Sequence, residues 1–359
     1  MKIFQRLCII SLLVLSFACN SDIETFENGY TIRHFSKRDF KIHQKINGTK
    51  YQENDILNPE GIHEIDNYIL VNEFSGDTLI HVVDKFTMKC IEHKGVFGQG
   101  PNEIFTPYRM YNDIHNPNSF WAFQVDGPKI FSRFTINDSS SYPTQQFQLR
   151  DSIYYMMHFT FSSDSTILGT LADGDYKFHE FNLNGNPITA SGSWTQMVDM
   201  DWPKNVISSL YSGIVTSDDS FRYFVLGSVK IDHLEVYDKK LGKYYGLRGP
   251  LDFFPNVAVD YSAGYPMLMS LGYDNPYGYA SVIVGQKYIY GLFSGYSRRE
   301  VDMIKEKGWD KLLVFERDGT PYKYIELDHQ LRDMTIDDEA GLMYGLTFDA
   351  NPNIVVYEL

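Results

Sequence analysis

Residues 311–321 read Lys311-Leu312-Leu313-Val314-Phe315-Glu316-Arg317-Asp318-Gly319-Thr320-Pro321, a β-rich run followed at once by an Asp-Gly turn. Glycine supplies the positive φ of a tight turn, so the chain can fold back into another antiparallel strand. The same order of strand and turn recurs along the chain about every 45 to 55 residues, close to the period of propeller blades. This stretch therefore predicts one unit of a repeated antiparallel sheet.

Six strand-like runs occupy matching places in the repeat. They are residues 79–84, 129–134, 176–181, 233–238, 311–316 and 353–358. Besides Asp318-Gly319-Thr320, the turn signals that follow such runs are Asn184-Gly185-Asn186, Lys240-Leu241-Gly242 and the looser Asn137-Asp138-Ser139. We predict an all-β fold, a six-bladed β-propeller of four-stranded antiparallel blades that spans residues 28–359.

The two ends of the repeat predict how the ring closes. The sixth unit ends at Leu359 directly after its third strand, whereas the strand-like run Tyr30–Phe35 belongs to no unit. We expect this N-terminal strand to complete the last blade, because closure removes an open sheet edge. Residues 297–308 interrupt the repeat and predict a short helix with a serine cap and a terminal glycine.

The N-terminus predicts export and lipid attachment. Lys2 and Arg6 precede an apolar run over residues 7–15, and Ser16-Phe17-Ala18-Cys19 follows as a lipobox. Residues 1–18 are then a cleaved lipoprotein signal peptide, too short to span a membrane, and Cys19 is the lipidated first residue of an acidic tether, residues 19–27. An ordinary secretory signal with Cys19 incidental is the alternative.

Charge and cysteine content exclude several classes of partner. Cleavage removes Lys2 and Arg6 and no acidic residue, so the formal net charge falls from −14 to −16. Such a chain repels phosphate backbones, so we expect no nucleic-acid partner, membrane contact through the lipid alone, and a monomer. Cys90 remains without a cysteine partner, and we interpret it as a buried strand residue with no base near it in the sequence.

Motifs for catalysis or cofactors do not stand out. The ten histidines are dispersed, so we expect no metal site assembled locally and no cofactor; a calcium ion in the channel, held by several blades, stays open. The segment 97–103 lacks the Lys-Ser/Thr of a phosphate-binding loop, and Gly-x-Ser-x-Gly is absent. We interpret the pairs Asp218/Asp219 and Asp337/Asp338 as turn residues.

Aromatic residues in the irregular segments are the candidates for ligand binding. Tyrosine suits stacking on sugars or burial against a partner, and the alternative is that these rings pack the insertions onto their own blades. The candidates are Tyr261, Tyr265, Tyr273, Tyr277 and Tyr279 in the loop 260–280, with Trp194 and Trp202 in the segment 191–208.

Three segments resemble the TolB-like six-bladed propeller lipoproteins of Bacteroidetes. They are Phe97-Gly98-Gln99-Gly100-Pro101-Asn102-Glu103-Ile104-Phe105, the run from Leu313 to Pro321 with Tyr324–Asp328, and Asp337-Asp338-Glu339 leading to Leu342-Met343-Tyr344-Gly345. The resemblance covers residues 25–359 and implies a lipid-anchored extracytoplasmic propeller of unsettled function, without a catalytic residue to transfer. The acidic residues behind Cys19 also resemble the surface-export signal of such lipoproteins.

These observations favour a binding protein over an enzyme. We expect an outer-membrane lipoprotein, on the cell surface or the periplasmic face, that serves as a ligand-binding or protein-interaction scaffold for a glycan, a peptide or a partner protein. The alternative is a propeller hydrolase that cleaves a glycan or lactone with channel-lining acids or calcium.

Overall fold

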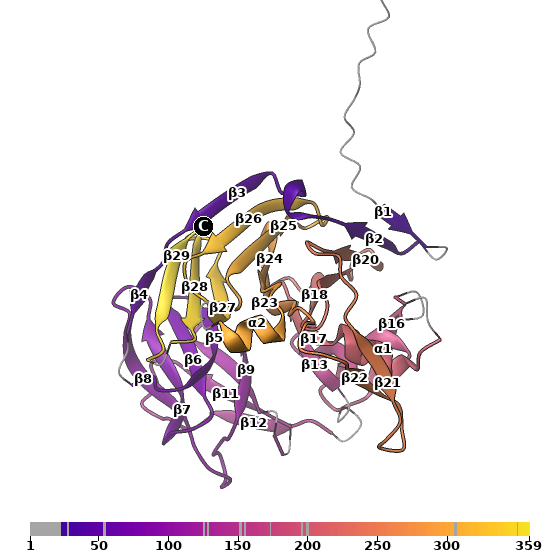
Figure 1. Ribbon diagram of the computed structural model, residues 1–359. Coiled ribbons are helices and arrows are strands. Elements are labelled where there is room, and N and C mark those ends of the chain that lie inside the picture. The colour runs from indigo at the N-terminus through magenta and orange to yellow at the C-terminus, as the bar shows by residue number, and fades with distance from the viewer. Residues whose placement is uncertain are drawn as a thin grey trace, which may run out of the picture.

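Six antiparallel sheets surround a central axis like the blades of a propeller (Figure 1). This arrangement comes from a computed structural model, which describes residues 23–26, 29–52, 55–124, 126–127, 129–150, 153, 156–172, 174–194, 197–198, 201–304, 307–349 and 351–359. The predicted all-β, six-bladed propeller is confirmed.

Each blade is an antiparallel meander that runs outward from the axis. The first three blades contain β5 (Pro59–Ile65), β6 (Tyr68–Glu73), β7 (Thr78–Asp84) and β8 (Lys89–Val96); β9 (Pro107–Asn112), β10 (Ser119–Gln124), β11 (Ile130–Thr135) and β12 (Gln145–Gln148); and β13 (Met156–Phe161), β14 (Thr166–Leu171), β15 (Tyr176–Asn182) and β16 (Pro187–Ser193). The other three contain β17 (Gly213–Ser217), β18 (Tyr223–Ser228), β19 (His233–Asp238) and β20 (Lys243–Arg248); β23 (Tyr279–Val284), β24 (Tyr288–Phe293), β25 (Lys311–Glu316) and β26 (Pro321–Leu327); and β27 (Leu331–Asp337), β28 (Leu342–Thr347) and β29 (Ile354–Glu358).

The six runs that carried the prediction are the third strands of the six blades. These strands are β7, β11, β15, β19, β25 and β29. The predicted turns link third to fourth strands, and their special positions have the positive φ that the sequence requires: Gly185 has φ 78°, Gly319 has φ 81° and Asn137 has φ 64°. Local turn chemistry therefore sets the blade repeat.

The ring is closed by an N-terminal strand, but not by the predicted one. Strand β4 (Thr49–Tyr51) pairs antiparallel with β29, with Lys50 opposite Val355, and so supplies the missing fourth strand of blade 6. The run Tyr30–Phe35 instead contains β2 (Thr31–His34), which lies parallel to β20 on the outer edge of blade 4. It is apolar because Tyr30 and Ile32 are buried in the core beneath that edge.

The same segment also crosses blade 5. After the 3-10 helix η1 (Lys37–Asp39), strand β3 (Ile42–Ile46) pairs parallel with β26. Residues 31–51 thus form a belt, called here the N-terminal belt, along the outer edges of blades 4, 5 and 6 (Figure 1). Before it, β1 (Ile23–Thr25) pairs with β2, so part of the predicted tether is a strand, while the signal peptide and Cys19 lie outside the described residues.

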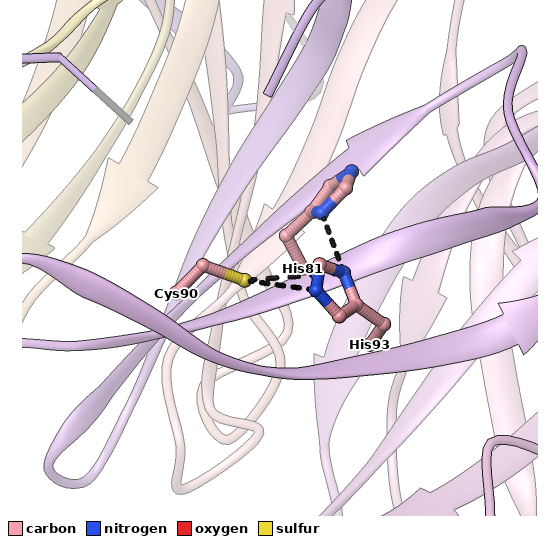
Figure 2. Close-up of side chains that lie close together, drawn as sticks. All are labelled: His81, Cys90 and His93. Atoms are coloured by element: carbon pink, nitrogen blue, oxygen red, sulfur yellow. Dashed lines mark hydrogen bonds between the residues drawn. The ribbon is translucent and has the colours of Figure 1, made fainter. Parts of the chain in front are cut away.

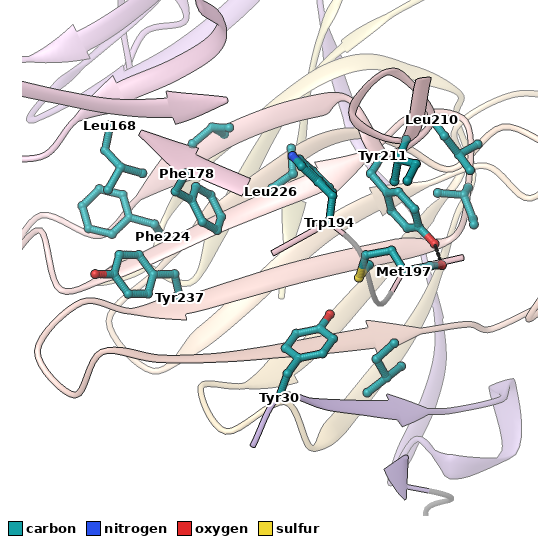
Figure 3. Close-up of a cluster of buried hydrophobic side chains, with 14 residues drawn as sticks. Tyr30, Leu168, Phe178, Trp194, Met197, Leu210, Tyr211, Phe224, Leu226 and Tyr237 are labelled. Carbon is teal, nitrogen blue, oxygen red and sulfur yellow. Dashed lines mark hydrogen bonds between the residues drawn. The ribbon is translucent and has the colours of Figure 1, made fainter. Parts of the chain in front are cut away.

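Apolar clusters fill the spaces between neighbouring blades. Figure 3 shows one, to which blade 3 contributes Phe178, blade 4 contributes Phe224 and the N-terminal segment contributes Tyr30. Trp194 and Tyr211 also belong to this cluster, and both residues are almost completely buried, at 1% exposure. Burial of such rings between sheets supplies much of the stabilisation of the ring.

A buried charge pair lies within the cluster of Figure 3. The Lys177 ammonium contacts Glu235 Oε2 at 2.8 Å, and the Tyr30 hydroxyl donates to the same oxygen at 2.7 Å. His233 Nε2 lies 3.1 Å from that oxygen. Burial would raise the pKa of Glu235, but the Lys177 charge and the His233 ring outweigh it and leave the pKa below its ordinary value. Glu235 is therefore a carboxylate that joins blades 3 and 4 to Tyr30.

Three insertions depart from the meander. Helix α1 (Lys204–Tyr211) precedes blade 4, and the hairpin of β21 (Val257–Asp260) and β22 (Met267–Ser270) precedes blade 5. Helix α2 (Arg298–Met303) lies between β24 and β25 and confirms the short helix predicted within 297–308. Ser297 caps it by accepting a hydrogen bond from the Glu300 amide.

Replacing Lys177 by methionine should lower the free energy of unfolding by about 3–5 kcal/mol, because Glu235 would stay buried without its counterion. Lys37→Met is the matched control: Lys37 pairs with Glu326 at the surface with about half of its side chain exposed, so its loss should cost less than about 1 kcal/mol. Urea denaturation measures both. Equal losses in the two variants would contradict the role of the buried pair.

Candidate functional site

A cavity of about 1040 Å³ runs into the centre of the ring. Its walls are the first strands of the blades, and residues of β5, β9, β13, β17, β23 and β27 line it. The charged residues of the lining are Glu64, Asp66, Asp218, Asp219, Asp333, Asp337, Asp338 and Glu339 against Arg109 and Arg317. Acidic groups thus outnumber basic groups, and the cavity favours positively charged or hydrogen-bond-donating ligands.

The mouth of the cavity lies on one face of the ring. The loops that line it, at 66–67, 218–221, 285–286 and 338–340, each connect a first strand to a second strand. Strand direction alternates within a blade, so these loops share one face, whereas connections from second to third strands and between blades lie on the other. Helices α1 and α2 and the β21–β22 hairpin therefore lie on the face opposite the mouth.

Polar contacts between blades hold the rim of the cavity. Lys85 pairs with Glu64 of blade 1 and, at 2.7 Å, with Asp337 of blade 6. The Asp338 carboxylate accepts hydrogen bonds at 2.6 Å from the Tyr290 hydroxyl and from the amide of Gln286, which joins blade 6 to blade 5. These contacts fix the loops around the mouth before any ligand arrives.

Arg317 connects blades 4 and 5 at the same rim. Its guanidinium lies 3.1 Å from the Asp218 carboxylate and donates to the Gly285 carbonyl at 2.5 Å. Asp218 also accepts from the amides of Arg222 and Tyr223, as expected of a turn residue. The interpretation of Asp218 as a turn residue is confirmed, and its neighbour Asp219 is left to face the cavity.

Deeper in the cavity, hydrogen bonds join the first strands of adjacent blades. His63 Nε2 lies 2.8 Å from Asn112 Oδ1, between blades 1 and 2. The Ile62 amide donates to Asp333 Oδ2 at 3.2 Å, between blades 1 and 6. Burial lowers the pKa of His63 to about 4, so its ring is neutral near pH 7 and donates from Nε2 to the amide oxygen of Asn112.

Two acids of the cavity hold their protons more tightly than usual. Burial raises the pKa of Asp333, against the opposing charge of Arg109. Burial and the neighbouring charge of Asp218 raise the pKa of Asp219. Among the described residues, Asp333 Oδ1 and Asn72 Oδ1 are buried in the wall of the cavity without a hydrogen-bond partner.

Sequence reasoning missed Arg109 and Asp333 because each lies within an ordinary alternating strand. Met110 and Met334 of the same strands point into apolar clusters, so their neighbours Arg109 and Asp333 face the other way, toward the cavity. Because side chains alternate along a strand, the sequence does show that positions 109 and 333 face away from the apolar clusters. Only the ring places them around a common axis.

Two of the predicted ligand-binding residues are core residues instead. Tyr279 is 0% exposed and packs against Phe293, with ring centroids 5.2 Å apart. Trp194 is 1% exposed, and its Nε1 donates to the Tyr176 carbonyl at 3.0 Å. The expectation of ligand contact is wrong for both, because their rings are enclosed by neighbouring blades.

The other predicted aromatic residues lie on the face opposite the mouth and do not line the cavity. Tyr261, Tyr265 and Tyr273 are exposed, at 61%, 58% and 55%. Tyr277 packs on Trp309 at a centroid distance of 5.1 Å, and Trp202 packs on Phe254 at 6.1 Å. Only the three exposed tyrosines are placed to meet a ligand there.

One group of possible metal ligands exists among the described residues, and it lies in blade 1 rather than in the channel. His81, Cys90 and His93 bring their ligand atoms within 4.8 Å of one another. The interpretation that no base lies near Cys90 in the sequence is wrong, because His93 is three residues further on and its ring contacts the sulfur.

Comparisons with known proteins agree with this architecture. A protein from Bacteroides fragilis NCTC 9343 described as exported is 11% identical, with a TM-score of 0.56, and the match covers 91% of this chain and 98% of that one. A member of the DUF4221 family from Bacteroides vulgatus ATCC 8482 is 10% identical, with a TM-score of 0.56 over 86% of this chain and 98% of that one. At these identities the likeness concerns the fold alone.

No curated protein sequence matches the chain. Within the described residues, neither helix has the length and apolar character needed to cross a membrane. The family model described as TolB-like 6-blade propeller-like matches residues 39–339. The chain belongs to the TolB-like six-bladed propeller family.

Proposed function

We propose that this protein is a lipid-anchored extracytoplasmic binding protein whose channel receives a polar ligand bearing an amino group, carried on a peptide or on an amino sugar. The excess of acidic over basic residues in a cavity of about 1040 Å³ carries this proposal. Such a volume accommodates one or a few residues of either kind of chain.

The distribution of charge supports an amine-bearing ligand. Arg317 is already paired with Asp218, and Lys85 with Glu64 and Asp337, so among the described residues no basic side chain forms an ion pair with Asp219 at the mouth. An ammonium group entering from that face would meet Asp219 first, and small side-chain shifts deeper in the wall would expose the unpartnered oxygens of Asn72 and Asp333 to the same ligand. Hydroxyl and amide donors of the same ligand would suit the latter two.

Calorimetry with the full chain tests the proposal against glucosamine oligosaccharides and lysine-rich peptides, each compared with its N-acetylated form. We expect saturable binding of at least one amine-bearing probe, loss of binding on acetylation, and roughly tenfold weaker binding in Asp219→Asn. Affinity should also fall with added salt.

Asp302→Asn is the matched control, since it removes the same charge from α2 on the opposite face, where Asp302 is 3.6 Å from Arg298 and exposed. Equal binding of free and acetylated probes, or equal loss in the two variants, would contradict the proposal. Binding that Tyr265→Ala weakens and Asp219→Asn does not would place the ligand on the β21–β22 hairpin instead.

A hydrolase that acts on a glycan or lactone is the second candidate function. The raised pKa values of Asp219 and Asp333 favour it, because a carboxyl group that keeps its proton can serve as a general acid. In that case Asp333→Asn would remove turnover of a bound substrate and leave its affinity unchanged. A bound ligand that is never converted would dismiss this candidate.

Anchoring through Cys19 completes the proposal and rests on the lipobox at residues 16–19. When the envelope of the native host is fractionated, we expect the unchanged protein to be found with the outer membrane. We expect the Cys19→Ala variant to be released from the membrane or to remain as uncleaved precursor. Membrane association of a processed Cys19→Ala variant would contradict lipid anchoring. Protease treatment of intact cells would separate the cell surface from the periplasmic face.

A further inference from the structure

Two histidines and a cysteine meet on one face of blade 1, at its outer edge (Figure 2). His81 lies on β7, and Cys90 and His93 lie on β8. His81 and His93 are directly opposite each other in the antiparallel register, and Cys90 is opposite Val83. All three belong to the third and fourth strands of the blade, away from the channel.

A β-bulge makes this cluster possible. Residues three apart on a regular strand point to opposite faces, so Cys90 and His93 should not meet. The register of β7 and β8 shifts between Val82, which pairs with Glu92, and Val83, which pairs with Cys90, and so leaves Ile91 as the extra residue. The bulge returns Cys90 to the face that His93 and His81 share.

The separations of the ligand atoms suit a tetrahedral ion. His81 Nδ1 lies 3.1 Å from His93 Nδ1, and Cys90 Sγ lies 4.0 Å from His93 Nδ1. An ion about 2.0–2.1 Å from nitrogen and about 2.3 Å from sulfur would separate its ligands by roughly 3.3–3.6 Å. The third separation, between His81 and Cys90, is at most 4.8 Å, so side-chain shifts of up to about 1 Å would complete the coordination.

A carboxylate faces the outer nitrogen of each imidazole. Glu73 Oε2 lies 2.9 Å from His81 Nε2, and Asp55 Oδ2 lies 3.8 Å from His93 Nε2. Glu73 is itself held, since its Oε1 accepts hydrogen bonds from the amides of Leu57, at 2.7 Å, and Asn58. Glu73 favours a proton on His81 Nε2, whereas Asp55 lies beyond hydrogen-bond distance and acts on His93 through its charge. Histidine ligands of metals have such outer-shell carboxylates.

This arrangement turns two lone pairs toward each other. With both Nε2 atoms protonated, both Nδ1 atoms are acceptors at a separation of 3.1 Å. A cation between the rings would satisfy both acceptors, whereas a neutral His93 ring protonated on Nδ1 would donate to His81 Nδ1 without one. A proton in that place would not involve the Cys90 thiol, which would keep its contact with the Glu92 carbonyl at 3.5 Å.

We propose that His81, Cys90 and His93 bind Zn²⁺ through the two Nδ1 atoms and the Cys90 thiolate, with water in the fourth position. Imidazole and thiolate together are the ligand set of zinc, and the Cys90 proton would leave on binding. The His81 side chain is 4% exposed and that of His93 is 42% exposed. The ion would therefore be held by a buried ligand on one side and could enter from solvent on the other.

The proposed ion would stabilise the place where the ring closes. Glu73 holds the amides of Leu57 and Asn58, in the segment that leads from the closing strand β4 to the first strand β5. Orientation of His81 by zinc would fix Glu73 and, through it, the backbone at Leu57 and Asn58. Zinc should therefore raise the resistance of the folded chain to urea, because it binds the folded state.

Titration of the reduced full chain with Zn²⁺ and with Co²⁺ tests the site. We expect one equivalent of Zn²⁺ to bind, a thiolate-to-cobalt absorption band with Co²⁺, and a rise in the urea midpoint with zinc. Cys90→Ser should abolish the cobalt band, His81→Ala should weaken zinc binding more than tenfold, and Glu73→Gln should weaken it roughly 10- to 100-fold.

His115→Ala is the matched control. His115 also faces a carboxylate, Asp164 at 3.4 Å, but it is 70% exposed on blade 2. Zinc binding should survive this change and Asp219→Asn alike, which separates the metal site from the channel. Absence of zinc binding, or binding and a cobalt band that persist in Cys90→Ser, would overturn the proposal; a proton between the rings would give the first of these results.

Discussion

The pairing of β4 with β29 is the constraint on which the ring depends, because it joins a strand near the N-terminus to the last strand of the chain. An unpaired β29 would leave blade 6 with an open outer edge, and contacts nearer the axis, such as Lys85 with Asp337, would have to hold it against blade 1. The N-terminal belt adds parallel pairings to blades 5 and 4 before the chain enters blade 1. One segment thus secures half of the ring from outside.

The shape of the channel depends on this closure of the ring. Its walls are first strands that touch across blade boundaries, including the boundary between β27 and β5, where the Ile62 and Glu64 amides donate to Asp333 and Thr335. That boundary is the one that β4 closes. Acidic side chains around a fixed mouth can then act on a ligand without first being ordered, which keeps the cost of binding low.

Sequence reasoning predicted the blades well because each blade is a local meander with its own turns, as the glycines at 185 and 319 illustrate. It misplaced the closing strand because β4 is short and exposed, whereas the strand around Ile32 has the apolar pattern of a core element. Both candidate sites depend on non-local geometry. The channel acids come from separate blades, and Cys90 joins the histidines only through a bulge that the sequence does not mark.

Hydrogen exchange of the first strands tests most directly whether the N-terminal segment holds the channel together. The comparison is between a chain that begins at residue 29 and one that begins at residue 52, which lacks the belt and β4. We predict that amides of β29, β27 and β5 exchange much faster in the shorter chain, while those of β10 and β11 in blade 2 change least. Equal protection of β27 and β5 in both chains would contradict the account.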